Sequence, residues 1–287
     1  MSELLIQHPT LSPTLLAELA QQLQSEPVMS SGQPDPMISA SQIARWPWPS
    51  GSRSQAADLA EKFSVDAAWI EQKRSLSDYR LLVFDMDSTL ITIECIDEMG
   101  DYFGKKNEVA AITEAAMRGE ISDYNESLRR RLNLLAGMPL HAMQQIYDER
   151  LQLSPGVERL IAASKQAGLK VLLVSGGFTF FADQLKIRLG LDFVRANRVE
   201  LRNEQLTGGL IGEIVNADVK QRIVEETCVA LGCSPAQAIV IGDGANDLKM
   251  MSIAGVSVAY RAKPVVRRQA LFALNYCPLD AALNFFA

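Results

Sequence analysis

Two aspartates, Asp85 and Asp87, stand two positions apart directly after an apolar run at residues 81–84. Four apolar residues that end at polar ones are typical of a buried parallel strand, and open α/β sheets bind ligands at the carboxyl ends of such strands. Side chains two apart in extended chain face the same side, so both carboxylates can reach one ligand. One can attack an electrophile while the other moves a proton, and both can help to hold a hard cation. Two aspartates in a turn are also common, so this pair alone favours chemistry only weakly.

A second polar cluster, Ser-Gly-Gly at residues 175–177, follows a strand predicted at residues 170–174 and precedes a helix predicted at residues 178–189. A hydroxyl group and exposed glycine N–H groups at a helix N-terminus form an anion-binding site, although a flexible turn would use the same residues. Lys220 lies near the start of a helix predicted at residues 218–231. A cation there is slightly unfavourable against the helix dipole, which mildly suggests an anionic partner, while a solvated lysine is the simpler interpretation.

A third cluster, residues 242–247, offers Asp243, Asn246 and Asp247 at the end of a strand predicted at residues 238–241. The glycines in this segment let the backbone turn tightly. Clustered oxygen ligands suit magnesium, which keeps several waters and takes few carboxylates. We expect four strand ends of one sheet, each with polar groups, to converge on one place. That convergence is a stronger indication of chemistry than any single segment.

The elements that would position these residues alternate between strand and helix from residue 79 onward. Repeated strands separated by helices imply a mostly parallel sheet with right-handed crossovers. One long helical stretch, residues 91–151, interrupts the alternation directly after the first strand. We therefore predict an α/β fold with a Rossmann-like core, residues 79–90 and 152–287, and a helical cap at residues 91–151. Between residues 192 and 215 the pattern predicts short strands with turns at Asn203 and at Gly208-Gly209.

Residues 1–78 form a separate N-terminal region, to which we can assign no role. Its apolar spacing predicts helices at residues 11–23 and 54–63 and a strand at residues 65–70. The stretch at residues 24–53 is rich in Ser, Pro and Gly, which predicts a loop with room for one short strand.

Composition excludes several classes of protein. The chain has 287 residues, enough to bury the core of one large or two modest domains. Its net charge is −6 and it has no basic stripe, which argues against a nucleic-acid partner. No apolar stretch approaches the roughly 20 residues of a membrane span, and no secretory pattern opens the chain, so we expect a cytoplasmic protein. With four cysteines in no CxxC pair and two histidines, we expect reduced thiols and no zinc site.

Together, the polar segments resemble the four motifs of the haloacid dehalogenase superfamily of phosphatases, in the same order and with fitting spacing. These segments are residues 85–89, residues 175–177, Lys220 and residues 242–247. Three further segments resemble the phosphoserine phosphatase family within that superfamily, namely residues 94–97, 116–119 and 127–131. The resemblance covers residues 79–287. It ends at the N-terminal region, which departs from the amino-acid-binding regulatory domains of some relatives and is short for one.

The resemblance implies a Mg²⁺-dependent phosphatase that hydrolyses O-phospho-L-serine to serine and phosphate, the last step of serine biosynthesis. Asp85 would attack phosphorus and form an aspartyl-phosphate. Asp87 would protonate the leaving serine oxygen and then deprotonate the attacking water. Asp85, the backbone carbonyl of Asp87 and Asp243 would hold Mg²⁺, with Asp247 as a further ligand or as a partner of the ligands.

The resemblance also implies which residues bind the substrate. Ser175, Gly176 and Lys220 would bind phosphate oxygens, and Asn246 would orient the phosphate or the metal ligands. The cap would recognise the amino-acid end, because a carboxylate suits an ammonium group and a bidentate arginine suits a carboxylate. The cap residues implied for this task are Glu94, Arg131, Met117 and Tyr124.

Two alternatives remain open at this point. A related enzyme could act on another small phosphomonoester or transfer the phosphate to a second alcohol. In a different class, a phospho-accepting signalling module also uses strand-end aspartates and a lysine. The helical cap and the acid Asp87 favour turnover, because a switch needs neither. We expect a small-molecule substrate and no membrane partner, and the sequence leaves open whether the chain forms a homo-oligomer.

Overall fold

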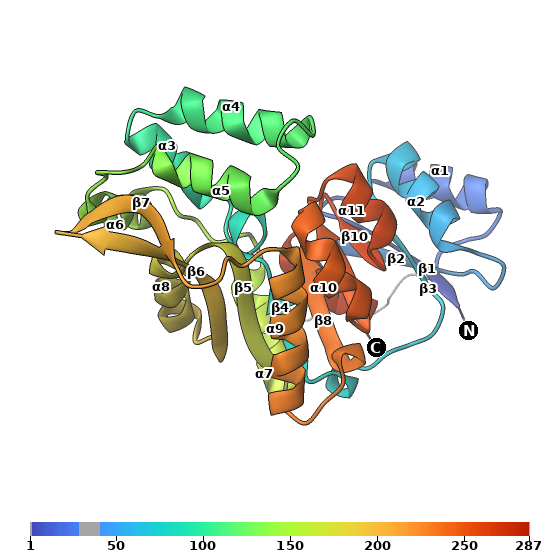
Figure 1. Ribbon diagram of the computed structural model, residues 1–287. Coiled ribbons are helices and arrows are strands. Elements are labelled where there is room, and N and C mark those ends of the chain that lie inside the picture. The colour runs from blue at the N-terminus through green and yellow to red at the C-terminus, as the bar shows by residue number, and fades with distance from the viewer. Residues whose placement is uncertain (1, 29–40, 287) are drawn as a thin grey trace.

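The structure is a computed structural model that describes residues 2–28 and 41–286. It has three parts, which can be followed in Figure 1: a small N-terminal unit, a central α/β core, and a helical cap over one edge of the core sheet. This is the fold class that the sequence predicts. Within the described ranges, no helix is both long and apolar enough to cross a bilayer.

The core is built on a seven-stranded sheet with the strand before Asp85 at its centre. The order is β10-β9-β8-β4-β5-β6-β7, and every pair is parallel except β6 with β7. The chain adds β5 on one side of β4 and β8 on the other, and ligands bind where strand order reverses in this way. The strands are β4 Leu81–Phe84, β5 Lys170–Phe178, β6 Phe193–Arg202, β7 Gln205–Ile211, β8 Ala238–Gly242, β9 Val256–Tyr260 and β10 Phe272–Leu274.

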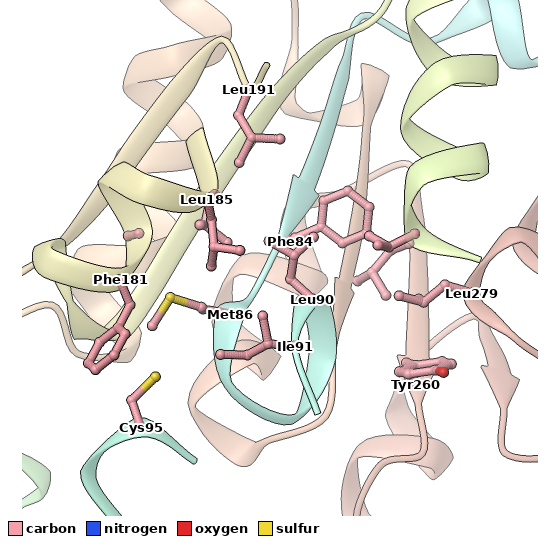
Figure 2. Close-up of a cluster of buried hydrophobic side chains, with 14 of the residues drawn as sticks. Phe84, Met86, Leu90, Ile91, Cys95, Phe181, Leu185, Leu191, Tyr260 and Leu279 are labelled. Atoms are coloured by element: carbon pink, nitrogen blue, oxygen red, sulfur yellow. The ribbon is translucent and has the colours of Figure 1, made fainter. Parts of the chain in front are cut away.

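Helices cover both faces of this sheet because both faces are apolar. Alternate residues of β4 point to opposite faces, Leu82 and Phe84 to one and Leu81 and Val83 to the other. The first face packs against α7 and α8, and the second against α9, α10 and α11. Figure 2 shows the first face, where Met86 extends this packing beyond the end of β4 beside α8. These helices are α7 Val157–Gln166, α8 Thr179–Leu189, α9 Ala217–Ala230, α10 Leu248–Ile253 and α11 Pro264–Gln269.

The cap is the helical segment between β4 and α7. Its apolar residues, such as Met99 and Leu132, join the same buried cluster as the first face of the sheet. The cap also rests on the β6–β7 hairpin, where the N–H of Gly137 donates to the carbonyl of Leu206 at 2.8 Å. One side of the cap is therefore supported by the core, while α3, α4 and α5 lie together at the top of Figure 1. Its helices are α3 Cys95–Tyr102, α4 Lys106–Met117, α5 Tyr124–Asn133 and α6 Leu140–Glu149.

The N-terminal unit is a three-stranded antiparallel sheet, order β2-β1-β3, with two helices and its own apolar cluster around Leu4 and Trp46. The sequence predicted both helices and the strand β3. It also allowed one short strand in the loop at residues 24–53, and β2 is that strand. We did not predict β1, and residues 29–40 of the predicted loop lie outside the described residues. The elements are β1 Glu3–His8, α1 Pro13–Leu23, β2 Gln42–Pro47, α2 Arg53–Phe63 and β3 Asp66–Ile70.

A buried carboxylate joins the N-terminal unit to the core. Asp66, at the start of β3, is 1% exposed. Its two oxygens accept the N–H groups of Asn275 at 2.6 Å, Tyr276 at 3.2 Å and Cys277 at 2.8 Å, directly after β10. Strands β3 and β10 are each the outermost strand of their own sheet and contact each other. The two sheets therefore lie side by side, with the outermost strand of one next to the outermost strand of the other.

Two local predictions were wrong. Residues 175–177 continue β5, with an irregular pairing to β6, so the strand that was predicted to end at residue 174 runs on to Phe178. In the β6–β7 hairpin the turn lies at Asn203 and Glu204, whose φ angles of 49° and 58° suit a tight hairpin turn. The predicted turn at residues 208–209 lies inside β7 instead.

Candidate active site

The carboxyl ends of the adjacent strands β4, β5 and β8 bring three of the polar segments together. Asp85 follows β4, residues 175–177 end β5, and Asp243 follows β8. Lys220 comes from the start of α9, as predicted, so three strand ends and one helix start converge here instead of the four strand ends that we expected. Asn216 caps α9 by accepting two N–H groups of its first turn at 3.1 Å. This cap fixes where α9 begins and therefore where Lys220 points.

Lys220 is completely buried between two carboxylates. Its Nζ lies 2.7 Å from Oδ1 of Asp85 and 2.8 Å from Oδ1 of Asp247. Burial alone would lower the pKa of Lys220, but the charges of Asp247 and Asp85 outweigh it and raise that pKa, so the lysine stays protonated. Burial and the charge of Asp247 raise the pKa of Asp85, and the contact with Lys220 opposes this shift. The N–H of Met86 also donates to Oδ1 of Asp85 at 2.7 Å and fixes its orientation.

Asp85, Asp243 and Asp247 form a carboxylate cluster whose ligand oxygens lie within 4.8 Å of one another. The ammonium of Lys220 contacts two of these three carboxylates, so ionisation of all three would leave two negative charges without compensation in a buried place. Burial and the charge of Asp247 accordingly raise the pKa of Asp243 to about 7. Buried carboxylates stay ionised only when positive charge compensates them, and a donor set of oxygens suits a hard divalent cation. These residues therefore fit a metal ion.

Asp87 has different surroundings from Asp85, although it lies only two positions away. Its carboxylate accepts the N–H of Cys95, the first residue of α3, at 3.0 Å. Burial, followed by the charge of Glu94, raises the pKa of Asp87 to about 7. A carboxyl group with a pKa near neutrality can both donate and accept a proton in one reaction cycle.

Two cap residues of opposite charge, Glu94 and Arg131, interact electrostatically with each other, and Glu94 also interacts with Asp87. Glu94 accepts a hydrogen bond from the Ser88 hydroxyl at 2.6 Å. The side chain of Glu94 remains accessible to solvent. The protein around it nevertheless desolvates the carboxylate and raises its pKa, whereas Ser88, Lys263 and Arg131 lower that pKa. Arg131, on α5, is partly buried, and its Nε donates to the carbonyl of Ser127 at 3.4 Å. The structure thus brings Glu94 and Arg131 within electrostatic range of each other.

The end of β5 approaches both the cap and the acid closely. Ser175 is buried, and its Oγ accepts the N–H of Gly177 at 2.8 Å. A Cβ at Gly176 would collide with the Tyr124 hydroxyl, and a Cβ at Gly177 with the Asp87 carboxylate. The hydroxyl of Tyr124 lies 3.5 Å from the carbonyl oxygen of Gly176, and burial raises the pKa of Tyr124 to about 12. Tyr124 is therefore a neutral hydrogen-bond donor at the point where cap and core meet.

The chain is similar in sequence to known hydrolases. The family model described as haloacid dehalogenase-like hydrolase matches residues 82–252. A phosphoserine phosphatase of Polaromonas sp. (strain JS666 / ATCC BAA-500) is 57% identical over 234 residues, which cover 80% of this chain and 98% of that protein. The chain belongs to the haloacid dehalogenase-like hydrolase family.

Solved structures extend the likeness beyond the core of this hydrolase. A HAD family hydrolase from Salmonella enterica subsp. enterica serovar Typhi superposes with a TM-score of 0.87 at 29% identity, covering 99% of this chain and 98% of that one. A probable phosphoserine phosphatase from Vibrio cholerae, in unliganded form, gives a TM-score of 0.82 at 32% identity over 99% of this chain and 85% of that one. Both alignments therefore include the N-terminal unit.

Two buried residues of this hydrolase's site received no role from sequence. Thr89 donates through Oγ1 to Oδ1 of Asp243 at 3.2 Å, which links the loops after β4 and β8. Asn197, on β6, donates through Nδ2 to the carbonyl of Gly176 at 2.7 Å and accepts the N–H of Val215 at 2.8 Å. A signal for Asn197 existed in the sequence, namely an amide at a strand position that faces inward.

The remaining predicted site residues have different environments. Asp247 is fully buried, and besides contacting Lys220 it accepts the N–H of Gly244 at 3.0 Å. Asn246 is half-buried and packs against Gly244, where a Cβ would collide with its Oδ1. Met117 is the last residue of α4, and its side chain is not among those that the structure describes. The roles of Asn246 and Met117, like those of the other predicted site residues, stay predictions.

Proposed function

We propose that this hydrolase is a Mg²⁺-dependent phosphoserine phosphatase, which converts O-phospho-L-serine and water to serine and phosphate. The observation that carries the proposal is the position of Tyr124. Its partly buried hydroxyl is within electrostatic range of Lys220, Asp85 and Asp87 on the core side and of Arg131 on the cap side. Groups that suit a phosphate and groups that suit an amino acid therefore surround one place. The relative from Polaromonas sp. is named a phosphoserine phosphatase and the structure from Vibrio cholerae a probable one, which supports this substrate.

In the first step we assign the attack on phosphorus to Asp85. Lys220 and the N–H of Met86 both hold its Oδ1, so Oδ2 is the attacking atom. The bond from Oδ2 to phosphorus forms while the bond from phosphorus to the serine oxygen breaks. Asp87, whose pKa is about 7, gives its proton to that oxygen as it leaves.

In the second step a water molecule attacks the phosphorus of the aspartyl-phosphate. Asp87, now ionised, takes a proton from this water, and the bond between phosphorus and Asp85 breaks. The products are inorganic phosphate and the free Asp85 carboxylate, with Asp87 protonated again. The N–H of Cys95, 3.0 Å from Oδ1 of Asp87, keeps the acid oriented in both steps.

Phosphate oxygens would be bound by the hydroxyl of Ser175, the backbone of Gly176 and the ammonium of Lys220. Magnesium, when bound, neutralises charge between the anionic nucleophile and the anionic phosphate. The residues proposed to hold it are Asp85, the backbone carbonyl of Asp87, Asp243 and, directly or through these, Asp247.

Selectivity would come from the cap. Glu94 suits the ammonium group of phosphoserine, and the guanidinium of Arg131 suits its carboxylate. Tyr124 and Met117 would line the pocket, and Asn246 would orient the phosphate or its metal. Generic phosphomonoesters lack the two charged groups of the amino-acid end, so they would gain nothing from Glu94 or Arg131.

The test compares O-phospho-L-serine with p-nitrophenyl phosphate in steady-state kinetics of Arg131→Ala and Glu94→Gln. Loss of a charged hydrogen-bonding partner costs about 1.5–3 kcal/mol. At about 1.4 kcal/mol per tenfold, kcat/KM for phosphoserine should fall at least about tenfold, with little change on the aryl phosphate. Arg130→Ala is the matched control, because Arg130 lies next along α5 and pairs with Glu126 at 2.7 Å.

Equal losses on both substrates would assign Glu94 and Arg131 to folding or chemistry, and the phosphoserine proposal would lose its physical basis. A panel of other small phosphomonoesters completes the test. Wild-type kcat/KM that is higher for one of these than for phosphoserine would contradict the proposed substrate while leaving the phosphatase chemistry intact.

A further inference from the structure

Ser88 adopts a backbone conformation that favours glycine. It lies in the tight turn Met86–Leu90, between Asp87 and Thr89, with φ 54° and ψ 2°. In this left-handed region a Cβ crowds the following carbonyl oxygen, and glycine adopts it without strain. Serine at this position therefore strains the backbone, and a residue that is kept in a strained conformation is expected to have a functional side chain.

The side chain of Ser88 holds Glu94. Its Oγ donates to Oε1 of Glu94 at 2.6 Å, and its N–H donates to the carbonyl of Ile93 at 3.1 Å. Glu94 stands at the N-cap position of α3, but its side chain makes no capping hydrogen bond. Asp87 accepts the first N–H of α3, from Cys95, instead. The Glu94 carboxylate is thus withdrawn from its own helix and fixed by the turn that carries the acid.

We propose that Ser88 is a positioning residue that sets substrate specificity through Glu94. Because the hydroxyl occupies Oε1, the other oxygen, Oε2, is the one presented to an ammonium group. The inference rests on the proposed function, since it takes Glu94 as the partner of the phosphoserine ammonium. It assigns separate tasks to neighbours in one turn: Asp87 moves the proton, and Ser88 orients the residue that recognises the amino acid.

Two substitutions separate this role from a structural one. Ser88→Ala removes the hydroxyl and keeps the strained backbone, whereas Ser88→Gly removes both. Each should raise KM for O-phospho-L-serine about five- to tenfold and change kcat/KM for p-nitrophenyl phosphate less than about twofold. Ser88→Gly should also melt at the same temperature as wild type or higher, because the crowded Cβ is gone. A merely structural residue would instead lower the melting temperature and both activities together.

Asn203→Gly is the matched control for relief of backbone strain. Asn203 has a φ of 49° in the exposed β6–β7 turn. This variant should gain or keep stability in the same way as Ser88→Gly, and its KM for phosphoserine should equal that of wild type. A rise in KM as large as that of Ser88→Gly would overturn the proposal, because strain relief alone would then explain the effect.

A double-mutant cycle tests whether Ser88 acts through Glu94. In the Glu94→Ala background, adding Ser88→Ala should cost nothing further on phosphoserine, since the partner is already gone. A full additional loss would overturn the proposal. If Glu94→Ala is selective for phosphoserine but Ser88→Ala is not, this inference alone fails. If Glu94→Ala lowers activity on both substrates equally, both this inference and the proposed function fail.

Discussion

At the residue scale, two aspartates of one turn acquire different chemistry from their neighbours. Asp85 contacts the ammonium of Lys220, which stabilises the ionised form that the proposed attack on phosphorus requires. Burial, followed by the negative charge of Glu94, raises the pKa of Asp87 and so stabilises its protonated form. Opposite neighbours on paired carboxyl groups are what separate a nucleophile from an acid. The proposed roles of the two aspartates therefore depend on one charge from the far-off helix α9, Lys220, and on one from the start of the cap, Glu94.

Substitution of each aspartate by asparagine should have a different effect. Asp85→Asn should abolish turnover, because an amide cannot form the acyl phosphate. Asp87→Asn should lower kcat by about 10²–10⁴, the usual contribution of a general acid and base. Rapid-quench and steady-state assays measure both values, with mass spectrometry to exclude deamidation. Substantial turnover by intact Asp85→Asn would contradict the assignment.

The raised pKa of Asp87 predicts how activity depends on pH. The first step needs Asp87 protonated, so kcat/KM for phosphoserine should fall as the pH rises through about 7. Glu94 raises this pKa by its negative charge, and its removal stabilises ionised Asp87. Glu94→Gln should therefore move the alkaline limb to lower pH. Glu114→Gln, at an exposed position of α4, is the control. A limb that stays in place in Glu94→Gln would rule out this coupling.

At the element scale, the site depends on how three strand ends and the start of α9 are aligned. Strand β4 pairs with β5 and β8 in parallel register, which places their carboxyl ends at one edge. Asn197 adds a link that no strand pairing supplies. It joins the carbonyl of Gly176, at the end of β5, to the N–H of Val215, just before α9. The distance between the backbone of Gly176, which we propose binds phosphate, and Lys220 should therefore depend on the amide of Asn197.

Asn197→Asp tests that link. Aspartate can still accept the N–H of Val215, but it cannot donate to the carbonyl of Gly176. We expect inhibition by inorganic phosphate to weaken about tenfold, while inhibition by L-serine changes little. Ser164→Ala, which trims a buried serine on α7, is a control for loss of a buried polar group. Equal weakening of both inhibitors by Asn197→Asp would indicate a general disturbance of the site.

Elements were predictable from sequence where local pattern determines them. Strand β4 is four apolar residues that end at a charge, and the helices of the cap show clear apolar spacing. Strand β1 was missed because a short apolar run is ambiguous until its partners are known. The role of Asn197 was missed for a similar reason, since its partners Gly176 and Val215 lie 21 and 18 positions away.

At the scale of the whole molecule, one apolar cluster spans all three parts. It includes Leu5 and Ile70 of the N-terminal unit, Phe84 of the central strand, and Met99 and Leu132 of the cap. Parts that share one buried core are expected to unfold together, since none can leave without exposing the others. The protein should therefore unfold in a single thermal transition, and changes of charge at the active site should shift its melting temperature.

Protonation of the site should be visible in that transition. The folded, metal-free protein raises the pKa values of Asp87 and Asp243 to about 7, above their unfolded values near about 4. The stability that these two carboxyl groups contribute is fully present below their pKa in the unfolded chain. It is lost as the pH rises through their higher pKa in the folded protein. With chelator, the melting temperature should therefore be lower at pH 8 than at pH 6.

Magnesium should reverse this dependence, because it binds the ionised carboxylates and adds most stability at the higher pH. Calorimetry with chelator and with Mg²⁺ at both pH values measures the effect. Chelated protein that melts equally at both pH values would contradict the proposed charge balance of the cluster.

The meeting of β3 and β10 has a consequence for self-association. Each strand is the outermost of its sheet, and an uncovered outer strand offers unpaired N–H and carbonyl groups to any other chain. Here the N-terminal unit lies against β10, and Asp66 occupies the N–H groups that follow it. Removal of this unit would turn the rim of the catalytic sheet into a template for strand addition. We therefore expect the shortened chain to aggregate before any loss of catalysis could be measured.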